Sequence, residues 1–168
     1  MSNSENDYKT KLVKVNIPEG TNVVFGMSHF IKTVEDLYET LIESGTAIKF
    51  GIAFCEASQK RLIRCDGNDP EMIDLATTAA FDVACGHSFF VYMKDAFPVN
   101  ILSRVKNVSE VCRIFCATAN PLEVIVAESG LGRGVLGVID GQTPLGIEED
   151  EDRRERVAFL RRINYKRG

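Results

Sequence analysis

The chain has 168 residues, of which 45% are hydrophobic and 26% are charged, and this composition suits one globular domain. Its net charge of −4 argues against general nucleic-acid binding, which needs a broad basic surface. No apolar stretch approaches the roughly 20 residues that cross a bilayer, so no membrane association is expected. The first residues lack the basic and apolar segments of a signal peptide, and the five scattered cysteines form no regular disulfide framework. These features together predict a cytoplasmic protein with buried thiols.

Residues 1–8 are polar and acidic and are expected to form a disordered tail, followed by a single compact domain over 9–168. Apolar residues that alternate with polar ones predict strands, and apolar residues spaced by three or four predict helices. In chain order, the expected elements are strands over 11–17 and 22–25, a helix over 33–44, strands over 48–55 and 61–65, a helix over 70–84, a strand over 88–93, a short helix over 98–105, strands over 111–118, 122–127 and 135–140, and a terminal helix over 153–163.

Two of the helix starts carry local signals. Thr33 and Asp36 resemble a capping box, in which two side chains bond each other's backbone amides. Asp69 suits an N-cap and Pro70 suits the first helical position. Because strands follow one another in pairs and threes across short turns, the order of elements predicts an α+β fold of α/β type. We expect a mixed, largely antiparallel sheet that is covered by helices.

The loop from Gly26 to Thr33 joins a strand end to a helix start. Free backbone N–H groups at such a position attract phosphate or carboxylate, and Ser28, His29, Lys32 and Thr33 add side-chain donors. His29 is also a candidate general base at neutral pH. The alternative is a capped helix that carries a surface histidine.

A glycine-rich segment places Gly132, Gly134 and Gly137 in the spacing G-x-G-x-x-G. The dinucleotide fingerprint requires a helix after these glycines, whereas a strand is expected here, so we reject that interpretation. A glycine turn between two strands lets backbone N–H groups approach a ligand closely, and Arg133 adds a planar donor fork for phosphate. The alternative is a plain hairpin turn with flexible glycines.

Carboxylates lie at three strand ends. Asp140 precedes Gly141 at the start of a loop, a common place for a base, a metal contact or a ribose-binding acid, although this pair can also simply make a turn. Glu56 and Glu128 each end an apolar strand, where a half-buried carboxylate can bind a ribose hydroxyl or pair with an arginine. No metal site is expected, because the segment Asp66–Asp69 is better explained as a helix start.

Three further features bear on function. The chain has no G-x-x-x-x-G-K-[ST] loop, so it would not hold ATP in the way that the common NTPases do. His87, which lies beside an apolar strand, is interpreted as a structural residue. The acidic run over 148–152 is followed by Arg153, Arg154 and Arg156, and the helix that they begin is interpreted as solvated or as a subunit contact.

Four segments of the chain resemble one protein family. They are residues 25–38, 49–58, 111–121 and 132–141, and the similarity extends over nearly the whole chain from about Lys11. The family is that of the adenosine-specific kinases, small adenosine- or AMP-binding proteins that are mostly archaeal and thermophilic. The resemblance implies a compact α/β domain, assembly into a homotrimer, and adenosine or AMP as the ligand. It also implies kinase activity.

Two functions are carried forward as hypotheses. In the first, the protein transfers a phosphoryl group to adenosine, which needs a base near the ribose hydroxyl and positive charge near the phosphate. The candidate bases are His29 and Asp140, and the candidate substrate contacts are Ser28, Lys32, Glu56, Gly132, Arg133, Gly134 and Gly141. A variant makes His29 a transient phosphoryl carrier. The sequence leaves the cofactor open, and a kinase activity would require ATP with Mg²⁺. In the second, the protein is a non-catalytic sensor or sequestering module, which the missing triphosphate motif favours.

Overall fold

The structure is a computed structural model that describes residues 7–167. Most of the predicted tail, residues 1–6, therefore lies outside the described residues. The elements are β1 (Lys9–Val15), β2 (Asn22–Ser28), α1 (Thr33–Ile42), β3 (Lys49–Cys55), β4 (Ile63–Gly67), α2 (Pro70–Val83), β5 (Ser88–Lys94), α3 (Pro98–Lys106), β6 (Val111–Thr118), β7 (Leu122–Glu128), β8 (Arg133–Asp140) and α4 (Asp150–Arg162). Each element expected from the sequence is present, and only the ends differ, by a few residues.

The strands form two sheets, and every strand pair among residues 7–167 is antiparallel. The larger sheet has the order β4-β3-β5-β2-β6 and the smaller sheet has the order β1-β7-β8. The α+β class is confirmed. The crossover through α1 does join two strands that run in the same direction, β2 and β3, but β5 lies between them and pairs with both. The described strands therefore form no parallel pair of the kind expected in a mixed sheet, and the antiparallel pairs β2–β5 and β5–β3 stand in its place.

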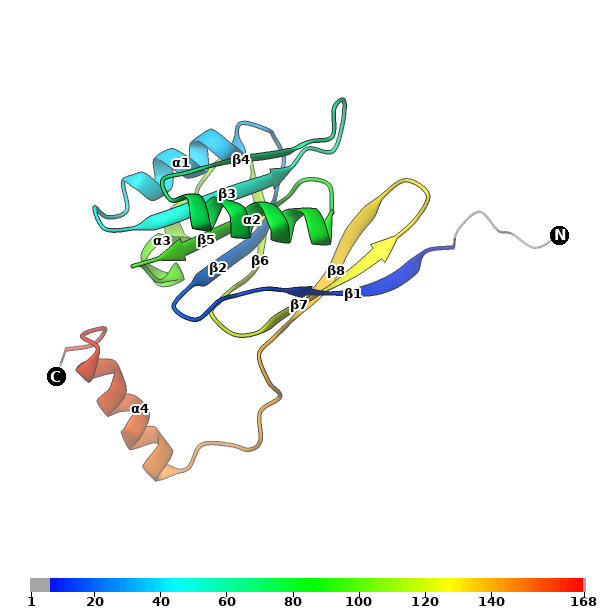
Figure 1. Cartoon of the computed structure of the whole chain (residues 1–168). Helices are drawn as coiled ribbons and strands as arrows, with labels where there is room; N and C mark the ends of the chain where they lie inside the picture. Colours follow the sequence, from blue (N-terminus) through cyan, green and yellow to red (C-terminus); the bar gives the residue numbers. More distant parts are fainter. Residues whose placement is uncertain (1–6, 168) are drawn as a thin grey trace.

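The larger sheet has a hydrophobic core on each face. Helix α2 and the smaller sheet cover one face, where Phe25, Phe90 and Val124 belong to one cluster of buried side chains. Helices α1 and α3 cover the other face, around Leu37 and Phe54. Figure 1 shows α2 in front of the larger sheet and the smaller sheet running beneath it. Full burial of each large apolar side chain contributes about 1.5–3 kcal/mol, so these two clusters provide most of the stabilisation.

Helix α2 is capped as predicted, whereas helix α1 is not, although both begin at the predicted residue. The carboxylate of Asp69 accepts a hydrogen bond from the backbone N–H of Met72 at 3.1 Å, as an N-cap does. At α1 the N-cap position is Lys32, which makes no capping bond with its side chain. The hydroxyl of Thr33 instead bonds Ser28 and the carbonyl oxygen of Phe30. The capping-box interpretation is therefore wrong, because the loop before α1 uses this hydroxyl to close on itself.

Gly51 of β3 lies directly under α2. A Cβ atom at this position would stand 2.2 Å from backbone atoms of Met72 and Ile73, and backbone cannot yield as a side chain can. We expect Gly51→Ala to lower the free energy of unfolding by about 3 kcal/mol, the upper part of the range for overpacked cores. In urea unfolding, Gly45→Ala is the matched control, because a Cβ atom there meets nothing within 4 Å. Equal unfolding midpoints for the two variants would contradict this account of α2 packing.

The C-terminal segment stands apart from the two sheets. After β8 the chain runs through a loop to α4, and none of the residues of α4 is buried. Figure 1 shows α4 separated from the rest of the molecule. Among residues 7–167 no helix has the length and apolar character needed to span a membrane.

Candidate functional site

A large open cavity lies between α2, the loop from β3 to β4, and the tip of the hairpin formed by β7 and β8. Its volume is about 1190 Å³, which is ample for a nucleotide. The residues that line it include Cys55, Glu56, Arg61, Leu62, Thr77, Phe81, Ala84, Leu131, Gly132, Arg133 and Gly134. Four of the predicted substrate contacts, from two segments more than 70 residues apart, therefore meet in one cavity.

Glu56 follows the last residue of β3 and presents an ionised carboxylate to the cavity. One of its oxygens accepts a hydrogen bond from the backbone N–H of Leu62 at 3.1 Å, and Arg64 donates to both oxygens at 3.0 and 3.2 Å. The Leu62 amide, followed by the Arg64 guanidinium, holds the pKa of Glu56 below its ordinary value. Both functions that the sequence left open, pairing with an arginine and acceptance from a ligand hydroxyl, are compatible with this geometry, because a carboxylate has about four acceptor sites.

Arg133 opens β8 on the other side of the cavity. Its Nε donates to Glu128 at 2.5 Å, and its Nη1 donates to the backbone carbonyl oxygen of Asp82, at the end of α2, at 3.1 Å. These bonds hold the guanidinium plane beside the cavity and leave further N–H groups for a ligand. The flanking Gly132 and Gly134 have open space where a Cβ atom would stand, so a ligand can approach their backbone.

Two buried polar atoms beside the cavity lack a partner. Among the described residues, the hydroxyl of Thr77 and the Nε of Arg64 are buried without a hydrogen bond. Thr77 lines the cavity from α2, and Arg64 is the partner of Glu56. Buried polar groups are paired in most proteins, so these two atoms are exceptions in the layer directly behind the cavity wall.

The loop after β2 lies beside this cavity without lining it. The backbone N–H of Ser28 donates to the carbonyl oxygen of His87 at 2.9 Å, and the N–H of His87 donates to Cys55 of the cavity wall at 2.8 Å. Two strand spacings of about 4.8 Å therefore place Ser28 roughly 10 Å from the cavity wall. His29 follows it and is exposed. The backbone of His87 therefore links the three strand ends, and its ring stacks on that of Phe54.

Ser28 and Lys32 are both engaged inside the protein. Ser28 is fully buried and its hydroxyl bonds Thr33, so it offers no donor to a ligand from this position. The ammonium of Lys32 bonds Asp36 and lies 3.1 Å from the buried carboxylate of Glu110. The bonds to Asp36 and Glu110 raise the pKa of Lys32. Within this loop, His29 is the predicted residue that is exposed and has no side-chain bond in the described chain.

Asp140 and Gly141 lie far from the other predicted residues. Asp140 ends β8, and seven residue rises of about 3.3 Å separate it from Arg133 by roughly 23 Å. Its carboxylate accepts hydrogen bonds from Thr118 at 2.6 Å and Asn120 at 3.2 Å. Thr118 pairs with the start of β2, whereas His29 follows its end, so roughly 20 Å separates the two candidate bases. The structure does not bring them to one substrate.

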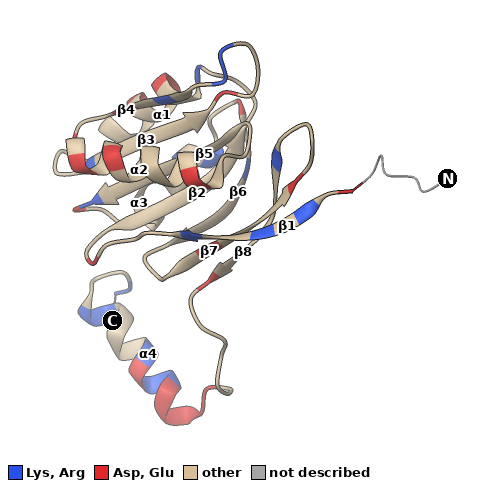
Figure 2. Ribbon diagram, turned by 45° about the vertical axis from the view of Figure 1, so that its right-hand side comes forward, with Lys and Arg blue, Asp and Glu red and all other residues tan. Residues whose placement is uncertain are grey.

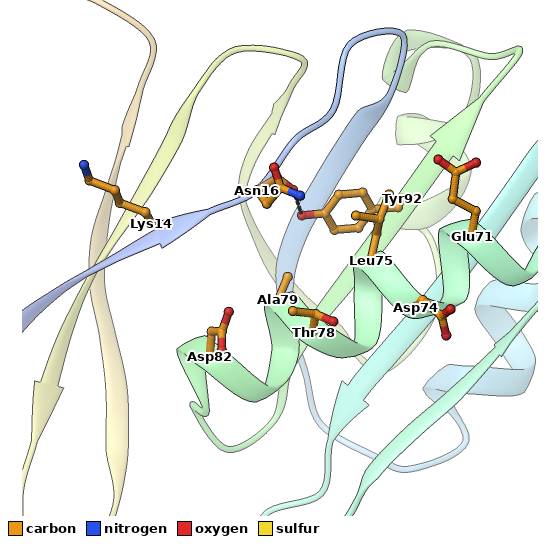
Figure 3. Close-up of a pocket in the computed structure, with 9 residues that line it drawn as sticks. All are labelled: Lys14, Asn16, Glu71, Asp74, Leu75, Thr78, Ala79, Asp82 and Tyr92. Atoms are coloured by element: carbon orange, nitrogen blue, oxygen red, sulfur yellow. Dashed lines mark hydrogen bonds between the residues drawn. The ribbon is translucent and has the colours of Figure 1, made fainter.

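A second groove lies between α2 and β1 and has a volume of about 510 Å³. Figure 3 shows three carboxylates along α2 beside it, from Glu71, Asp74 and Asp82, with Lys14 on the opposite strand. Its floor includes Tyr92, whose hydroxyl donates to the backbone carbonyl oxygen of Asn16 at 2.7 Å. The negative charge of this groove opposes a phosphate, so the groove is not a candidate nucleotide site.

Sequence reasoning missed the contributions of α2 and of the loop after β3. Phe81 is 73% exposed and lines the cavity, as do Thr77 and Arg61. Thr77, Phe81 and Ala84 recur at helical spacing, which could have indicated a second face on α2 beside its buried one. Among residues 7–167, no group of three His, Cys, Asp or Glu side chains is placed to hold a metal ion.

Comparisons with known proteins agree with this fold. The profile of the adenosine specific kinase family matches residues 13–166. The chain therefore belongs to the adenosine specific kinase family. It is also similar to the crystal structure of the PH1918 protein from Pyrococcus horikoshii OT3, with 42% identity and a TM-score of 0.92 over 96% of this chain and 100% of that chain. A search of curated proteins found no match.

Proposed function

We propose that the protein binds adenosine or AMP in the cavity between α2 and the β7–β8 hairpin, and that it phosphorylates adenosine. One observation carries the proposal: the cavity joins an apolar wall to a carboxylate on one side and to an arginine with open glycine amides on the other. An adenine nucleotide has three parts that complement these features: a flat aromatic base, a ribose diol and an anionic phosphate. Membership of the adenosine specific kinase family supports the same ligand.

Each part of the cavity suits one part of the ligand. The exposed ring of Phe81 and the side chain of Leu62 offer an apolar surface on which adenine can stack. The carboxylate of Glu56 accepts hydrogen bonds from ribose hydroxyls. Arg133 and the backbone amides beside it meet the phosphate, for which a planar donor fork is well shaped.

In the kinase reaction we assign the base to His29. It lies at the same end of the larger sheet as the cavity, about two strand spacings of 4.8 Å from its wall, whereas Asp140 lies at the opposite end. The alternative mechanism, in which His29 carries the phosphoryl group transiently, requires His29 in the same position. ATP would be the donor, and Mg²⁺ characteristically arrives with its phosphates.

The non-catalytic sensor is the second candidate function. The observation that favours it is the engagement of the charged side chains around the cavity, since Glu56 already pairs with Arg64 and Arg133 with Glu128. Such a wall can hold one phosphate by rearranging a single pair, whereas a triphosphate needs more positive charge. This function predicts adenosine or AMP binding without turnover.

Calorimetry with adenosine, AMP, ATP and guanosine, followed by a turnover assay with adenosine and ATP, tests both functions. Adenosine or AMP binding together with AMP formation supports the kinase, and binding without turnover supports the sensor. Guanosine binding as tight as adenosine binding would remove the adenine specificity that both functions share. Absence of any nucleoside binding would overturn the whole proposal.

The pH dependence of adenosine affinity follows from Glu56. Because its pKa lies below the ordinary value of 4.5, the carboxylate is ionised at neutral pH and its contribution to binding is lost only as pH falls through that lowered pKa. We expect calorimetry to give a constant affinity between about pH 6 and 8.

Glu56→Gln should weaken adenosine binding roughly 10-fold, the size of one charge-assisted hydrogen bond. Glu71→Gln, on the rim of the other groove, is the control and should bind normally.

We further propose a cytoplasmic homotrimer that acts on a small molecule and on neither nucleic acid nor membranes. The resemblance to the family and the net charge of −4 support this assignment. Light scattering on the full chain, with a mass of 18.6 kDa for one copy, measures the assembly directly.

A further inference from the structure

The C-terminal arm, residues 142–167, contributes nothing to the core of its own chain. Over these described residues not one side chain is buried, and Leu145, Ile147 and Phe159 are among its exposed apolar residues. A segment that orders 26 residues without burying apolar surface has no intramolecular source of stabilisation to offset the conformational entropy. Ion pairs such as Arg156 with Glu148 do not supply it, because exposed pairs are worth little.

The second half of α4, together with its C-cap residue, carries one apolar stripe. At about 100° per residue, Val157, Phe159, Leu160 and Ile163 fall within one side of the helix, while Ala158 falls on the opposite side. Figure 2 shows that charged residues cover much of the rest of α4, acidic at its start and basic beyond. An amphipathic helix of this kind normally packs its stripe against a sheet or another helix.

The smaller sheet has an apolar face without a cover. Its inner face carries Val124 and Val126 into the core. Its outer face carries Leu12 and Ile125 as register partners, with Ile139 close by. The β7–β8 register shifts after Ile125, which leaves Leu136 of β8 without a register partner, as in a β-bulge. The side chain of Leu136 turns outward and is 57% exposed. The register partners Lys14 and Glu123 lie beside these apolar residues on the same face. Antiparallel sheets that face water carry mostly polar residues on that side, so the apolar part of this face is built to be covered.

The arm is long enough to cover the apolar part of this face. The stripe from Val157 to Ile163 is about 9 Å long, helix α4 as a whole is about 20 Å long, and a strand of eight residues is about 26 Å long. The whole arm has 26 residues, within the roughly 20–30 residues that one side of a standard stable interface contains. A helix packed on a sheet is also one of the standard ways for both surfaces to become buried.

The extended position of the arm is shared with a crystal structure. The PH1918 protein aligns over 96% of this chain with a TM-score of 0.92. The arm makes up about 15% of the chain, so a differently placed arm would have kept the score below about 0.85. An arm that stays away from its own sheets in a relative that is 42% identical is held there by something outside its own chain.

We propose that the arm of one copy docks on a second copy of this chain, with the apolar stripe of α4 on the outer face of the β1-β7-β8 sheet. The proposal rests on the homo-oligomer proposed above and names the surface that holds it together. Repeated around a ring, the contact buries each arm and covers each outer face. Passed in one direction from copy to copy, the contact is heterologous, and it forms a ring such as a trimer where the rotation closes.

Light scattering of single variants tests this docking on the full chain. Leu160→Asp puts a charge in the stripe, and Ile139→Asp puts one on the outer face. Both should reduce the solution mass from that of the oligomer to the 18.6 kDa of one copy. Ala158→Asp, on the opposite side of α4, and exposed Phe97→Asp, at the start of α3, are the matched controls and should leave the mass unchanged.

Each outcome decides the proposal. An oligomer that survives Leu160→Asp overturns the docking and leaves the assembly standing, whereas an 18.6 kDa wild-type chain overturns both. Loss of mass in Ala158→Asp would show that any charge on the arm has this effect and would also overturn it. Leu160→Asp decides alone if Ile139→Asp fails to fold, because α4 supports no core. Adenosine calorimetry is read separately, so a failure of ligand binding is distinguishable from a failure of docking.

Discussion

Replacing His29 by alanine should reduce the rate of AMP formation from adenosine and ATP by about 100-fold or more, the usual contribution of a positioned base. His29 is exposed, has no side-chain partner in the described chain, and lies beside the cavity. Its loss should therefore leave folding and adenosine affinity almost unchanged. The rate is measured with purified protein at saturating adenosine, and the affinity by calorimetry on the same preparation.

Asp140→Asn is the informative comparison for His29→Ala. Asp140 accepts hydrogen bonds from Thr118 and Asn120, so its replacement should cost about 1 kcal/mol of stability while the rate of AMP formation stays within about twofold of wild type. The reverse pattern, with turnover lost in Asp140→Asn and kept in His29→Ala, would place the chemistry at the opposite end of the sheets. Normal turnover in both variants would remove both residues from the reaction.

Arg133→Ala should weaken AMP binding roughly 10- to 100-fold and leave adenosine binding nearly unchanged. The expected loss is that of a charge-assisted contact to phosphate, about 1.5–3 kcal/mol, and adenosine has no phosphate to lose. Calorimetry with both ligands gives the ratio of the two affinities. That ratio isolates the phosphate contact from any general change of the cavity.

Two controls separate charge from structure at Arg133. Arg133→Lys keeps the charge without the planar fork and should lie between the wild type and alanine. Arg133 also pairs with Glu128, whose pKa is lowered by Lys11 first and then by Arg133, so Lys11→Ala tests whether disturbing this carboxylate alone has an effect. Equal loss of adenosine and AMP affinity in Arg133→Ala would assign the residue to the hairpin's structure and not to the phosphate.

The order and type of the elements could be read from the sequence because their causes are local. The Asp69-Pro70 pair starts α2 by capping it and by presetting its first turn, and both effects act within four residues. Alternation of apolar residues in β1 and β7 needs only the two-residue period of a strand. The misinterpreted Thr33 shows the limit, since its hydroxyl had a tertiary partner in Ser28 that local rules do not contain.

The candidate site was predictable only in pieces. Glu56, Arg133 and the two glycines were recognisable by their chemistry, each at a strand end or in a turn. Their meeting in one cavity depends on how the smaller sheet packs on α2, which is set by contacts between residues far apart in the chain. For the same reason the sequence put His29 and Asp140 in one role, although the length of β2 separates them by about 20 Å.

By itself the sequence determined twelve elements, their class and the family, since propensity, capping and motif similarity all act over short stretches. The tertiary structure decided that the strands divide into two antiparallel sheets and that Phe81 faces the cavity. It also decided that α4 does not pack against the sheets of its own chain. These features depend on which apolar surfaces pack together, and those surfaces come from segments far apart in the chain. The hydrophobic effect that drives this packing is non-directional, so the connections of the backbone determine which surfaces can meet.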